Sequence, residues 1–408
     1  MVTPVVQVRL ADAGDLFLTW RWTSGASGYG SGQVPGAELA ETTGLLASAL
    51  PGHGAEGMRR AFLDSALCGY AGESDLAAAL AETLWPVQLT EQLRAVAAET
   101  GTRPTVRIQP SPRVAQVPWE LLAVDADTRL VELADLATSV PISLRRGTSA
   151  APQATDRVVL VLDPRVPGTR PGGALGSVLG QADADPGLLA MVRRHVDAGR
   201  VEPGQATGRA DLDRDWLGAA LRGGARRLLY VGHVSSAPVD GGQSEDAQLH
   251  LCCGPDTIGF ADVTRGHRPL SAKDLLLGTL SARADGVAGA ELWPAPERVA
   301  LIACESGGDL RFAESFGLGS AMIHNGAALV TATRWPVPTS HAFQRLTGLA
   351  ESVRPLTELI VAVDHAHEGP DPVRQLGDWQ RAQLARWRDG GRIEHSPLLW
   401  GALTTLVA

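Results

Sequence analysis

Short apolar runs without polar alternation mark the chain from residue 157 onward. The four clearest are Val158–Leu162, Leu228–Gly232, Val299–Ala303 and Ala327–Thr333. A strand with no polar face is covered on both sides, as in a parallel sheet between layers of helices. Helical patterns at Gly187–Ala198 and Asp211–Arg222 separate the first two runs, as expected for crossover units. We predict an α/β domain whose central sheet is mainly parallel and flanked by helices.

The rest of this region adds further helices and strands. A short strand is predicted at Gln248–Cys252, and Ser271 with Asp274 forms an acidic variant of the capping box at the start of a helix. The other predicted elements are helices at Phe312–Asn325, Ala342–Glu368 and Val373–Arg388, and a last strand at Leu398–Val407. No repeat of fixed period is present, which excludes a solenoid.

The first 150 residues follow a different pattern. Their predicted strands are Val5–Leu10, Leu16–Trp22 and Thr105–Gln109, and their predicted helices are Ala37–Ala49, Asp75–Glu99 and a short one after Pro118. Residues 24–32 have the composition of a flexible loop, and residues 145–156 that of a linker. We therefore predict an N-terminal α+β lobe over residues 1–150 and a second domain over residues 151–408.

Composition and charge narrow the class of protein. With 44% hydrophobic and 20% charged residues, the chain has the profile of a globular protein. Its formal net charge is −9 and no basic run is interleaved with aromatic residues, so we exclude nucleic acid as a direct partner. Lys273 is the only lysine, and abundant alanine and glycine indicate a GC-rich bacterial genome.

The termini and the cysteines bear on location. No basic segment followed by an apolar stretch opens the chain, and eighteen consecutive apolar residues occur nowhere, so we expect a cytoplasmic protein with no membrane partner. The four cysteines are Cys68, Cys252, Cys253 and Cys304. They show no C-x-x-C spacing, so we expect reduced thiols.

His233 and Cys304 each follow one of the buried strands directly. Ligands of open α/β sheets bind at the carboxyl ends of the strands, so two parallel strands would bring this imidazole and this thiol to one substrate. Small residues after the cysteine, Ser306 to Gly308, let backbone amides approach a ligand. Alone, such a cysteine or histidine is more often structural. Their joint placement indicates a cysteine hydrolase.

Motifs in a fixed order resemble those of CHAT domains, the caspase-like peptidases of bacteria. They are Val117–Leu122, Leu228–His233, Ala303–Ser306, Gly317–Ala321, Gly326–Val330, Arg334–Val337 and His395–Trp400. The order is more specific than any one motif, and the resemblance spans about Val117 to the C-terminus. The first hundred residues resemble no family that we name.

The resemblance implies a caspase-haemoglobinase fold, in which residues from about 105 form a pseudo-caspase-like part of the CHAT region. It implies a dyad, with Cys304 as nucleophile and His233 as the acid/base, and no cofactor or metal ion. The implied oxyanion donors are the main-chain amides of Cys304 and Val234. Family members often have glycine at the latter position, and valine permits fewer backbone angles and crowds the cleft. A narrowed or inactive enzyme is therefore an alternative.

The end of the strand Ala327–Thr333 is the predicted substrate edge, because a peptide added there gains main-chain hydrogen bonds. Trp335 is expected either to wall the pocket for the residue before the cut or to lie in the core. Arg334 either favours an acidic substrate residue or, as the preferred interpretation, is a solvated surface arginine. Thr333 and Glu305 complete the predicted substrate-binding set. An acidic residue that often follows in the family is missing here, so we infer no cleavage preference.

Three weaker signals favour structural roles. Asp364–Glu368 offers metal-ligand residue types, but helix positions two apart face different ways, which favours a solvated helix end. Cys252 and Cys253 are expected to point to opposite sides of a strand. The glycines of Gly28–Gly32 and Gly172–Gly180 lack the lysine and the strand-to-helix setting of phosphate loops, and indicate ordinary loops.

These observations predict a cysteine endopeptidase that cleaves a protein or peptide substrate through an acyl-enzyme on Cys304. The resemblance implies a hydrolase controlled by a partner protein in a bacterial defence setting such as antiviral defence. Two alternatives are open: a peptide-processing protease of a biosynthetic pathway, and an inactive scaffold that binds extended peptides.

Overall fold

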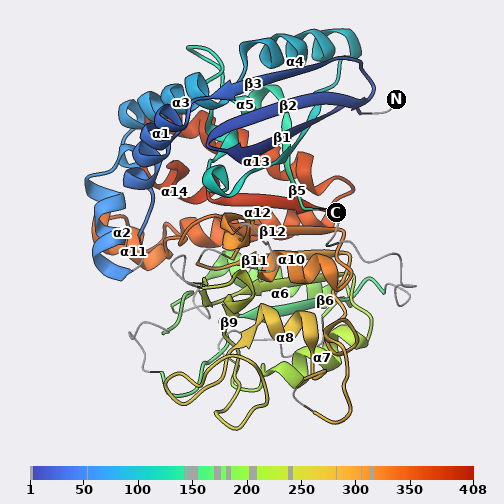
Figure 1. Cartoon of the computed structure of the whole chain (residues 1–408). Helices are drawn as coiled ribbons and strands as arrows, with labels where there is room; N and C mark the ends of the chain where they lie inside the picture. The colour runs from blue at the N-terminus through green and yellow to red at the C-terminus, as the bar shows by residue number, and fades with distance from the viewer. Residues whose placement is uncertain are drawn as a thin grey trace.

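One large sheet runs through the molecule (Figure 1). The computed structural model describes residues 3–52, 54–141, 144, 155–169, 176–180, 185–201, 209–237, 242–281, 283–304, 306–312 and 317–408. Within these residues the large sheet has the strand order β3-β2-β1-β4-β5-β13-β12-β11-β7-β6, and a smaller sheet has the order β10-β9-β8.

The strands of the large sheet are β1 (Val5–Ala13), β2 (Asp15–Ser24), β3 (Tyr29–Val34), β4 (Thr105–Gln109), β5 (Asp135–Ser139), β6 (Val158–Leu162), β7 (Arg227–Val231), β11 (Arg298–Ile302), β12 (Leu329–Thr333) and β13 (Leu403–Val407). The small sheet consists of β8 (Val234–Ser235), β9 (Gln248–Leu249) and β10 (Leu270–Ser271). The described helices are α1 (Gly36–Ala49), α2 (Gly54–Leu63), α3 (Tyr70–Leu84), α4 (Val87–Thr100), α5 (Leu130–Leu133), α6 (Pro186–Asp197), α7 (Arg214–Arg222), α8 (Ala272–Leu277), α9 (Gly289–Leu292), α10 (Leu318–His324), α11 (Ser340–Thr347), α12 (Pro355–Glu368), α13 (Pro372–Gly390) and α14 (Pro397–Trp400).

The large sheet consists of two parallel halves that run in opposite directions. Strands β6, β7, β11 and β12 are parallel neighbours, and so are β1, β4, β5 and β13. The halves meet at the antiparallel pair β12–β13, where Thr331 stands opposite Thr405. The carboxyl ends of β6, β7, β11 and β12 therefore lie along one edge. The prediction of a mainly parallel sheet is confirmed, and β1, β2 and β3 add an antiparallel border.

Alternate residues of the central strands face two separate hydrophobic cores. Leu229 and Ile302 pack with apolar residues of α6 and α12 on one face of the sheet. Leu228 and Leu301 pack with α7, α8 and α10 on the other. Because both faces are covered, these strands need no polar alternation, as the sequence pattern indicated. The predicted flanking by helices is confirmed.

Several helix predictions need correction. The pattern over Asp75–Glu99 forms two helices, α3 and α4, because Pro86 precedes the second and interrupts the first. Ala342–Glu368 is likewise divided into α11 and α12, since Gly348 ends the first in a left-handed conformation with φ of 74°. Of the predicted helix Phe312–Asn325, α10 forms over Leu318–His324, and residues 313–316 lie outside the described residues. Helix α2 was not foreseen.

The strand predictions also need adjustment. The glycine-rich loop over residues 24–32 ends at Tyr29, where β3 begins. The segment Leu398–Val407 starts with α14 before it becomes β13, and the strand predicted at Gln248–Cys252 ends at Leu249. Strand β5 was not foreseen. The capping box is confirmed, because Ser271 Oγ accepts from the Asp274 amide at 3.0 Å and Asp274 Oδ2 accepts from the Ser271 amide at 2.9 Å.

The predicted division after residue 150 falls within the large sheet, because β5 of the N-terminal lobe pairs with the C-terminal β13. Residues 145–154 of the predicted linker, and 172–175 of a predicted glycine loop, lie outside the described residues. The two-domain division stays a prediction. None of the described helices combines the length and the apolar composition that a membrane crossing requires.

Candidate active site

His233 and Cys304 stand at the same level on two neighbouring strands. The parallel register pairs Tyr230 of β7 with Leu301 of β11, and Val231 with Ile302. The Gly232 amide continues the ladder by donating to the Ile302 carbonyl at 3.3 Å. Each candidate residue follows its last paired residue by two positions, and neighbouring strands lie about 4.8 Å apart. The register therefore places the segments that carry these two residues at one edge of the sheet, and both residues are half-buried.

A backbone carbonyl fixes the His233 imidazole. Nε2 lies 2.5 Å from the carbonyl oxygen of Gly176, in the described segment 176–180. A carbonyl oxygen only accepts, so Nε2 carries the proton and Nδ1 of the neutral ring has the free lone pair. Nδ1 is therefore the atom that can take a proton from a thiol.

Asp163 holds that segment in place. It directly follows β6, whereas His233 is the second residue after β7, and the Asp163 amide donates to the Val231 carbonyl at 2.7 Å. Its carboxylate accepts from the amides of Val178 at 3.0 Å and Leu179 at 3.3 Å, and from the Ser177 hydroxyl. Its backbone is left-handed, with φ of 51°, a conformation rare outside glycine that clusters at functional sites. The sequence interpretation missed Asp163, although a polar residue just past a buried strand is a detectable signal.

The main chain of His233 is held by two neighbours. The Tyr230 hydroxyl reaches the carbonyls of His233 at 2.7 Å and His250 at 2.9 Å, and the His250 amide donates to the His233 carbonyl at 3.1 Å. Burial, with a smaller effect of Asp163, raises the pKa of Tyr230 well above its usual range. The hydroxyl therefore remains a donor, and the backbone after β7 has little freedom.

A hydrogen-bonded chain of side chains supports the small sheet beside His233. Ser235 Oγ lies 2.8 Å from His250 Nε2, and His250 Nδ1 lies 2.9 Å from His267 Nε2. Burial and the neighbouring His267 and His233 lower the pKa of His250 to about 3. The buried pair is therefore neutral at ordinary pH.

Val234 begins the edge strand β8, opposite Leu249 of β9. Because the His250 amide bonds the His233 carbonyl, Val234 and Leu249 form a non-hydrogen-bonded pair, which directs the Val234 N–H away from β9. The side chain of Val234 is buried in the core with Leu249. The expectation that valine crowds the cleft was wrong, because the extended backbone of β8 turns the side chain inward.

Ser306 and Thr333 bracket the turn that carries Cys304. Ser306 Oγ donates to the Leu301 carbonyl at 2.6 Å and accepts from the Thr333 amide at 3.0 Å. The Thr333 hydroxyl donates to the Ala303 carbonyl, and the Gly307 amide donates to the Thr333 carbonyl at 2.9 Å. The turn is thus fastened to the end of β12.

The predicted substrate-binding side chains are mostly interior. Thr333 and Trp335 are 0% and 1% exposed, and the Trp335 indole N–H donates to the Leu398 carbonyl at 3.0 Å. Of its two interpretations, Trp335 therefore lies in the core. Arg334 is 4% exposed, so its interpretation as a solvated arginine was wrong. Glu305 lies outside the described residues. Contact of these residues with a substrate stays a prediction.

Arg334 joins two of the motifs noted in the sequence. Its guanidinium donates to Glu120 Oε1 at 3.0 Å and to the carbonyl of Gly401 at 3.0 Å, and it forms an ion pair with Glu120 Oε2 at 3.0 Å. A buried guanidinium requires such a partner, and the carboxylate here comes from the segment Val117–Leu122. The two segments therefore support each other at the end of β12.

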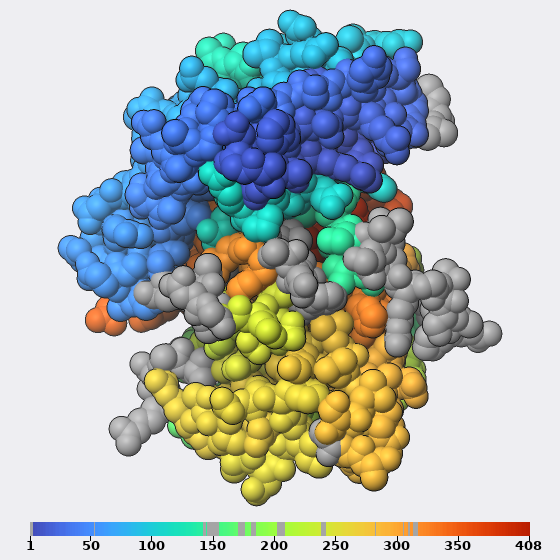
Figure 2. Space-filling model, viewed as in Figure 1, coloured from blue at the N-terminus to red at the C-terminus, as the bar shows by residue number. Residues whose placement is uncertain are grey.

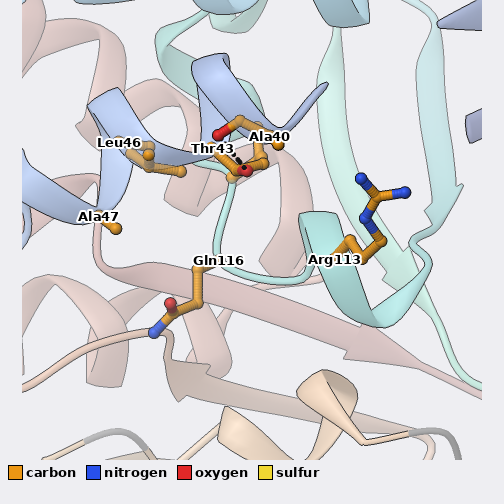
Figure 3. A pocket seen from close by; sticks show the side chains of 8 residues that line it. Ala40, Thr43, Leu46, Ala47, Arg113 and Gln116 are labelled. Atoms are coloured by element: carbon orange, nitrogen blue, oxygen red, sulfur yellow. Dashed lines mark hydrogen bonds between the residues drawn. The ribbon is translucent and has the colours of Figure 1, made fainter. Parts of the chain in front are cut away.

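A hollow of about 420 Å³ lies beside this end of β12 (Figure 3). It is lined by Ala40, Thr43, Gly44, Leu46 and Ala47 of α1 together with Arg113, Gln116 and Val117. The side-chain amide Nε2 of Gln116 donates to the Arg334 carbonyl at 3.2 Å. The hollow therefore lies next to the strand that was predicted as the substrate edge. Its wall combines small and apolar residues with the polar side chains of Thr43, Arg113 and Gln116, which is the mixed composition of a ligand pocket.

Asp364 and His367 near the end of α12 are not solvated, which corrects the sequence interpretation for these two residues, whereas His365 is exposed. Asp364 and His367 are 2% and 3% exposed, and Asp364 pairs with His195 at 2.9 Å and with Arg227 at 3.1 Å. The described residues contain no group of three or more metal-binding side chains.

The remaining cysteines are placed differently from Cys304. Burial raises the pKa of Cys252 to about 11 and also raises the pKa of Cys253. Neither lies within a strand, because β9 ends at Leu249. All four cysteines are described, and none forms a disulfide.

The chain is similar to known proteins in sequence family and in fold. The CHAT domain family model matches residues 74–406. A chain of the Saccharomyces cerevisiae separase–securin complex aligns with a TM-score of 0.52 at 9% identity, over 99% of this chain and 30% of that chain, and shares the caspase-like fold. The Arg-specific cysteine proteinase gingipain R aligns with a TM-score of 0.41 at 10% identity, over 78% of this chain and 66% of that chain. No curated protein sequence gives a significant match.

Proposed function

This chain belongs to the CHAT domain family, and from that membership and the geometry of the site we propose that it is a caspase-like cysteine endopeptidase. The observation that carries the proposal is the register that sets Cys304 and His233 at one level of adjacent strand ends. A nucleophile and a base in reach of one another, with the base oriented by a third group, form the general arrangement of covalent catalysis. Here the third group is the Gly176 carbonyl.

The proposed reaction starts with transfer of the Cys304 thiol proton to His233 Nδ1. The sulfur attacks the scissile carbonyl carbon, and the carbonyl electron pair moves to oxygen, where the main-chain amides of Val234 and Cys304 donate to it. Collapse of this adduct breaks the C–N bond while His233 returns the proton to the leaving amine. Water, deprotonated by His233, then hydrolyses the thioester and releases the free thiol.

The direction of the Val234 amide supports its oxyanion role, because an edge strand leaves that N–H pointing outward. The same observation weakens the alternative of an inactive scaffold, whose support was crowding by valine. We also propose that the hollow beside Gln116 receives a substrate side chain. Activity in the cytoplasm of a bacterium, in a partner-controlled defence setting or in peptide processing, belongs to the same proposal.

The test is selective alkylation of the folded protein with limiting iodoacetamide at pH 6. A thiolate reacts and a thiol does not, so Cys304 should be labelled at least about tenfold faster than Cys252 and Cys253, whose raised pKa values keep them protonated. His233→Ala should abolish this preference, and Cys304→Ala should remove both the label and the cleavage of a peptide library. Equal labelling of all four cysteines, or cleavage that persists in Cys304→Ala, refutes the proposal.

A further inference from the structure

Three arginines on the outer face of the N-terminal strands lack acidic partners. Arg9 of β1, Arg21 of β2 and Arg107 of β4 are exposed, and none makes an ion pair or a side-chain hydrogen bond with another described residue. Other arginines of the chain, such as Arg129 and Arg334, are paired with buried carboxylates. The three side chains are therefore available to an external group.

The strand register brings these arginines together. One row across the sheet is Tyr29, Arg21, Gln7 and Arg107, and the next row is Ser31, Thr19, Arg9 and Gln109. With neighbouring strands about 4.8 Å apart, Arg21 and Arg107 lie on the two sides of Gln7 at about 10 Å from each other. Arg9 lies on the same face, two residues beyond Gln7. The two rows contain no carboxylate, so this basic face carries three uncompensated positive charges.

The other side of these strands is already occupied. Trp20 and Trp22 point inward, and both indole N–H groups donate to Gln92 Oε1 of α4, at 3.1 and 3.0 Å. The outer face has no such cover: Thr19, Ser31 and Gln33 are exposed. The strands β1 to β3 lie at the surface in the upper part of the molecule, coloured blue in Figure 2. The basic face is thus an open sheet face.

A shallow hollow of about 480 Å³ gives the basic face its shape. It is lined by Gln7, Arg9, Thr19, Trp20, Arg21, Tyr29, Gly30 and Ser31. Gly30 stands opposite Trp20 and is required for packing on the inner face, because a Cβ atom would stand 2.1 Å from the Trp20 ring. Tyr29, at the rim, is 82% exposed. Arginine together with exposed tyrosine and a set of uncharged hydrogen-bonding groups is the composition of a protein-binding surface.

We propose that the basic face binds an acidic segment of a partner protein. Guanidinium groups bind carboxylates through paired hydrogen bonds, and the two rows add neutral donors and acceptors around them. The chain as a whole carries a net charge of −9, so a long polyanion such as nucleic acid is repelled outside this face, whereas a short acidic segment is not. The face lies on β1, β2 and β4, separated from β11 by β5, β13 and β12, so the inference is independent of the peptidase proposal.

The experiment measures fluorescence anisotropy of a labelled synthetic peptide with glutamate at every second position. The full chain should bind it, the triple variant Arg9→Gln, Arg21→Gln, Arg107→Gln should bind at least about tenfold more weakly, and added salt should weaken binding by the wild type. A matched control carries the same change at the exposed Arg59, Arg193 and Arg283, and should bind as the wild type does. The same peptide with glutamine in place of glutamate should not bind.

Several results overturn the inference. They are absence of binding to the wild-type chain, equal binding by the triple variant, and equal weakening in the control variant. Tighter binding of a single-stranded oligonucleotide or of anionic phospholipid vesicles through the same arginines assigns the face to a polyanion or a membrane instead. Circular dichroism checks folding, and Arg9→Gln alone replaces a triple variant that does not fold. Labelling of Cys304 by iodoacetamide should be unchanged in all these variants. A failure of peptide binding can therefore be distinguished from a failure of the peptidase proposal.

Discussion

At the scale of single residues, Asp163 determines how the His233 imidazole is presented. The carboxylate accepts from the amides of Val178 and Leu179, and the same segment supplies the Gly176 carbonyl that binds His233 Nε2. The histidine is therefore oriented by a backbone carbonyl. The Asp163 carboxylate does not contact the imidazole and acts on it only by holding the segment 176–180. Asp163 is a positioning residue, because it touches no reacting atom.

The substitution Asp163→Asn tests this role. An amide offers one acceptor oxygen where the carboxylate offers two charged ones, so the segment 176–180 should loosen and the imidazole should lose its fixed orientation. We expect the iodoacetamide reaction of Cys304 to slow by about tenfold or more, with a smaller effect on folding. The control is Asp125→Asn, because that carboxylate also accepts from two backbone amides, Asp127 at 2.9 Å and Thr128 at 2.8 Å, in the N-terminal lobe. Equal rates in the wild type and in Asp163→Asn would contradict the role.

The sequence predicts the places of His233 and Cys304 because their signal is local: an apolar run followed at once by a reactive side chain. The roles of Asp163 and Arg334 depend on contacts with distant segments. Arginine is usually solvated, so the pattern around Arg334 favoured the surface, and only the fold brings Glu120 to it. Their catalytic roles are still proposals for all residues of the site.

At the scale of elements, the turn after β11 takes its shape from the neighbouring strand. The Thr333 hydroxyl at the end of β12 bonds the Ala303 carbonyl and lies 3.1 Å from Ser306 Oγ. The sequence indicated both strands correctly, yet an apolar run gives no information on hydrogen bonds between the ends of adjacent strands. It missed β5 and divided neither Asp75–Glu99 nor Ala342–Glu368, because periodicity continues across a short break between helices.

Thr333→Val removes the hydroxyl and keeps the shape of the side chain. The buried Ala303 carbonyl loses its donor, which costs about 1–3 kcal/mol of stability, and the Cys304 turn should become mobile. We expect kcat for peptide cleavage to fall about tenfold or more with little change in KM. Thr331→Val is the control, since Thr331 lies on the same strand, is equally buried and bonds His367 Nε2 at 2.7 Å. An equal loss of kcat in both variants would show a general effect of stability.

At the scale of the whole molecule, the carboxyl and amino ends of the parallel strands β7 and β11 carry different kinds of residues. The carboxyl ends carry His233 and Cys304, whereas the amino ends begin with the buried Arg227 and Arg298. Arg227 donates to the backbone carbonyl of Asp364 at 2.9 Å and Arg298 to that of His367 at 2.7 Å. Helix α12 is thereby fastened to β7 and β11 at the edge opposite the candidate site, which stabilises the sheet without occupying the cleft.

Acid should weaken the packing of α12 against the sheet, because buried titratable side chains of α12 lie at this contact. Burial lowers the pKa of His367 to about 3, with Arg227 and Arg298 adding to the effect and Asp364 opposing it. Burial alone raises the pKa of Asp364, but the hydrogen bond and charge of His195 and the charges of Arg227 and Arg194 outweigh it and lower the pKa. His367 is thus neutral in the fold and protonated in the unfolded chain between about pH 6.5 and 3. Its stabilising contribution is present above pH 6.5 and is lost as the pH falls through that window.

We therefore expect the free energy of unfolding to fall by about 1.4 kcal/mol per pH unit for each such histidine below pH 6. His250, whose pKa is also lowered to about 3, contributes with the same sign. Urea unfolding between pH 7.5 and 4.5 measures how steeply the free energy of unfolding falls with pH. His367→Gln should reduce this slope by the contribution of one histidine, because glutamine does not titrate. His341→Gln, on the exposed side of α11, is the control and should leave the slope unchanged. If His367→Gln retains the full slope, protonation of His367 is not what weakens the junction between α12 and the sheet.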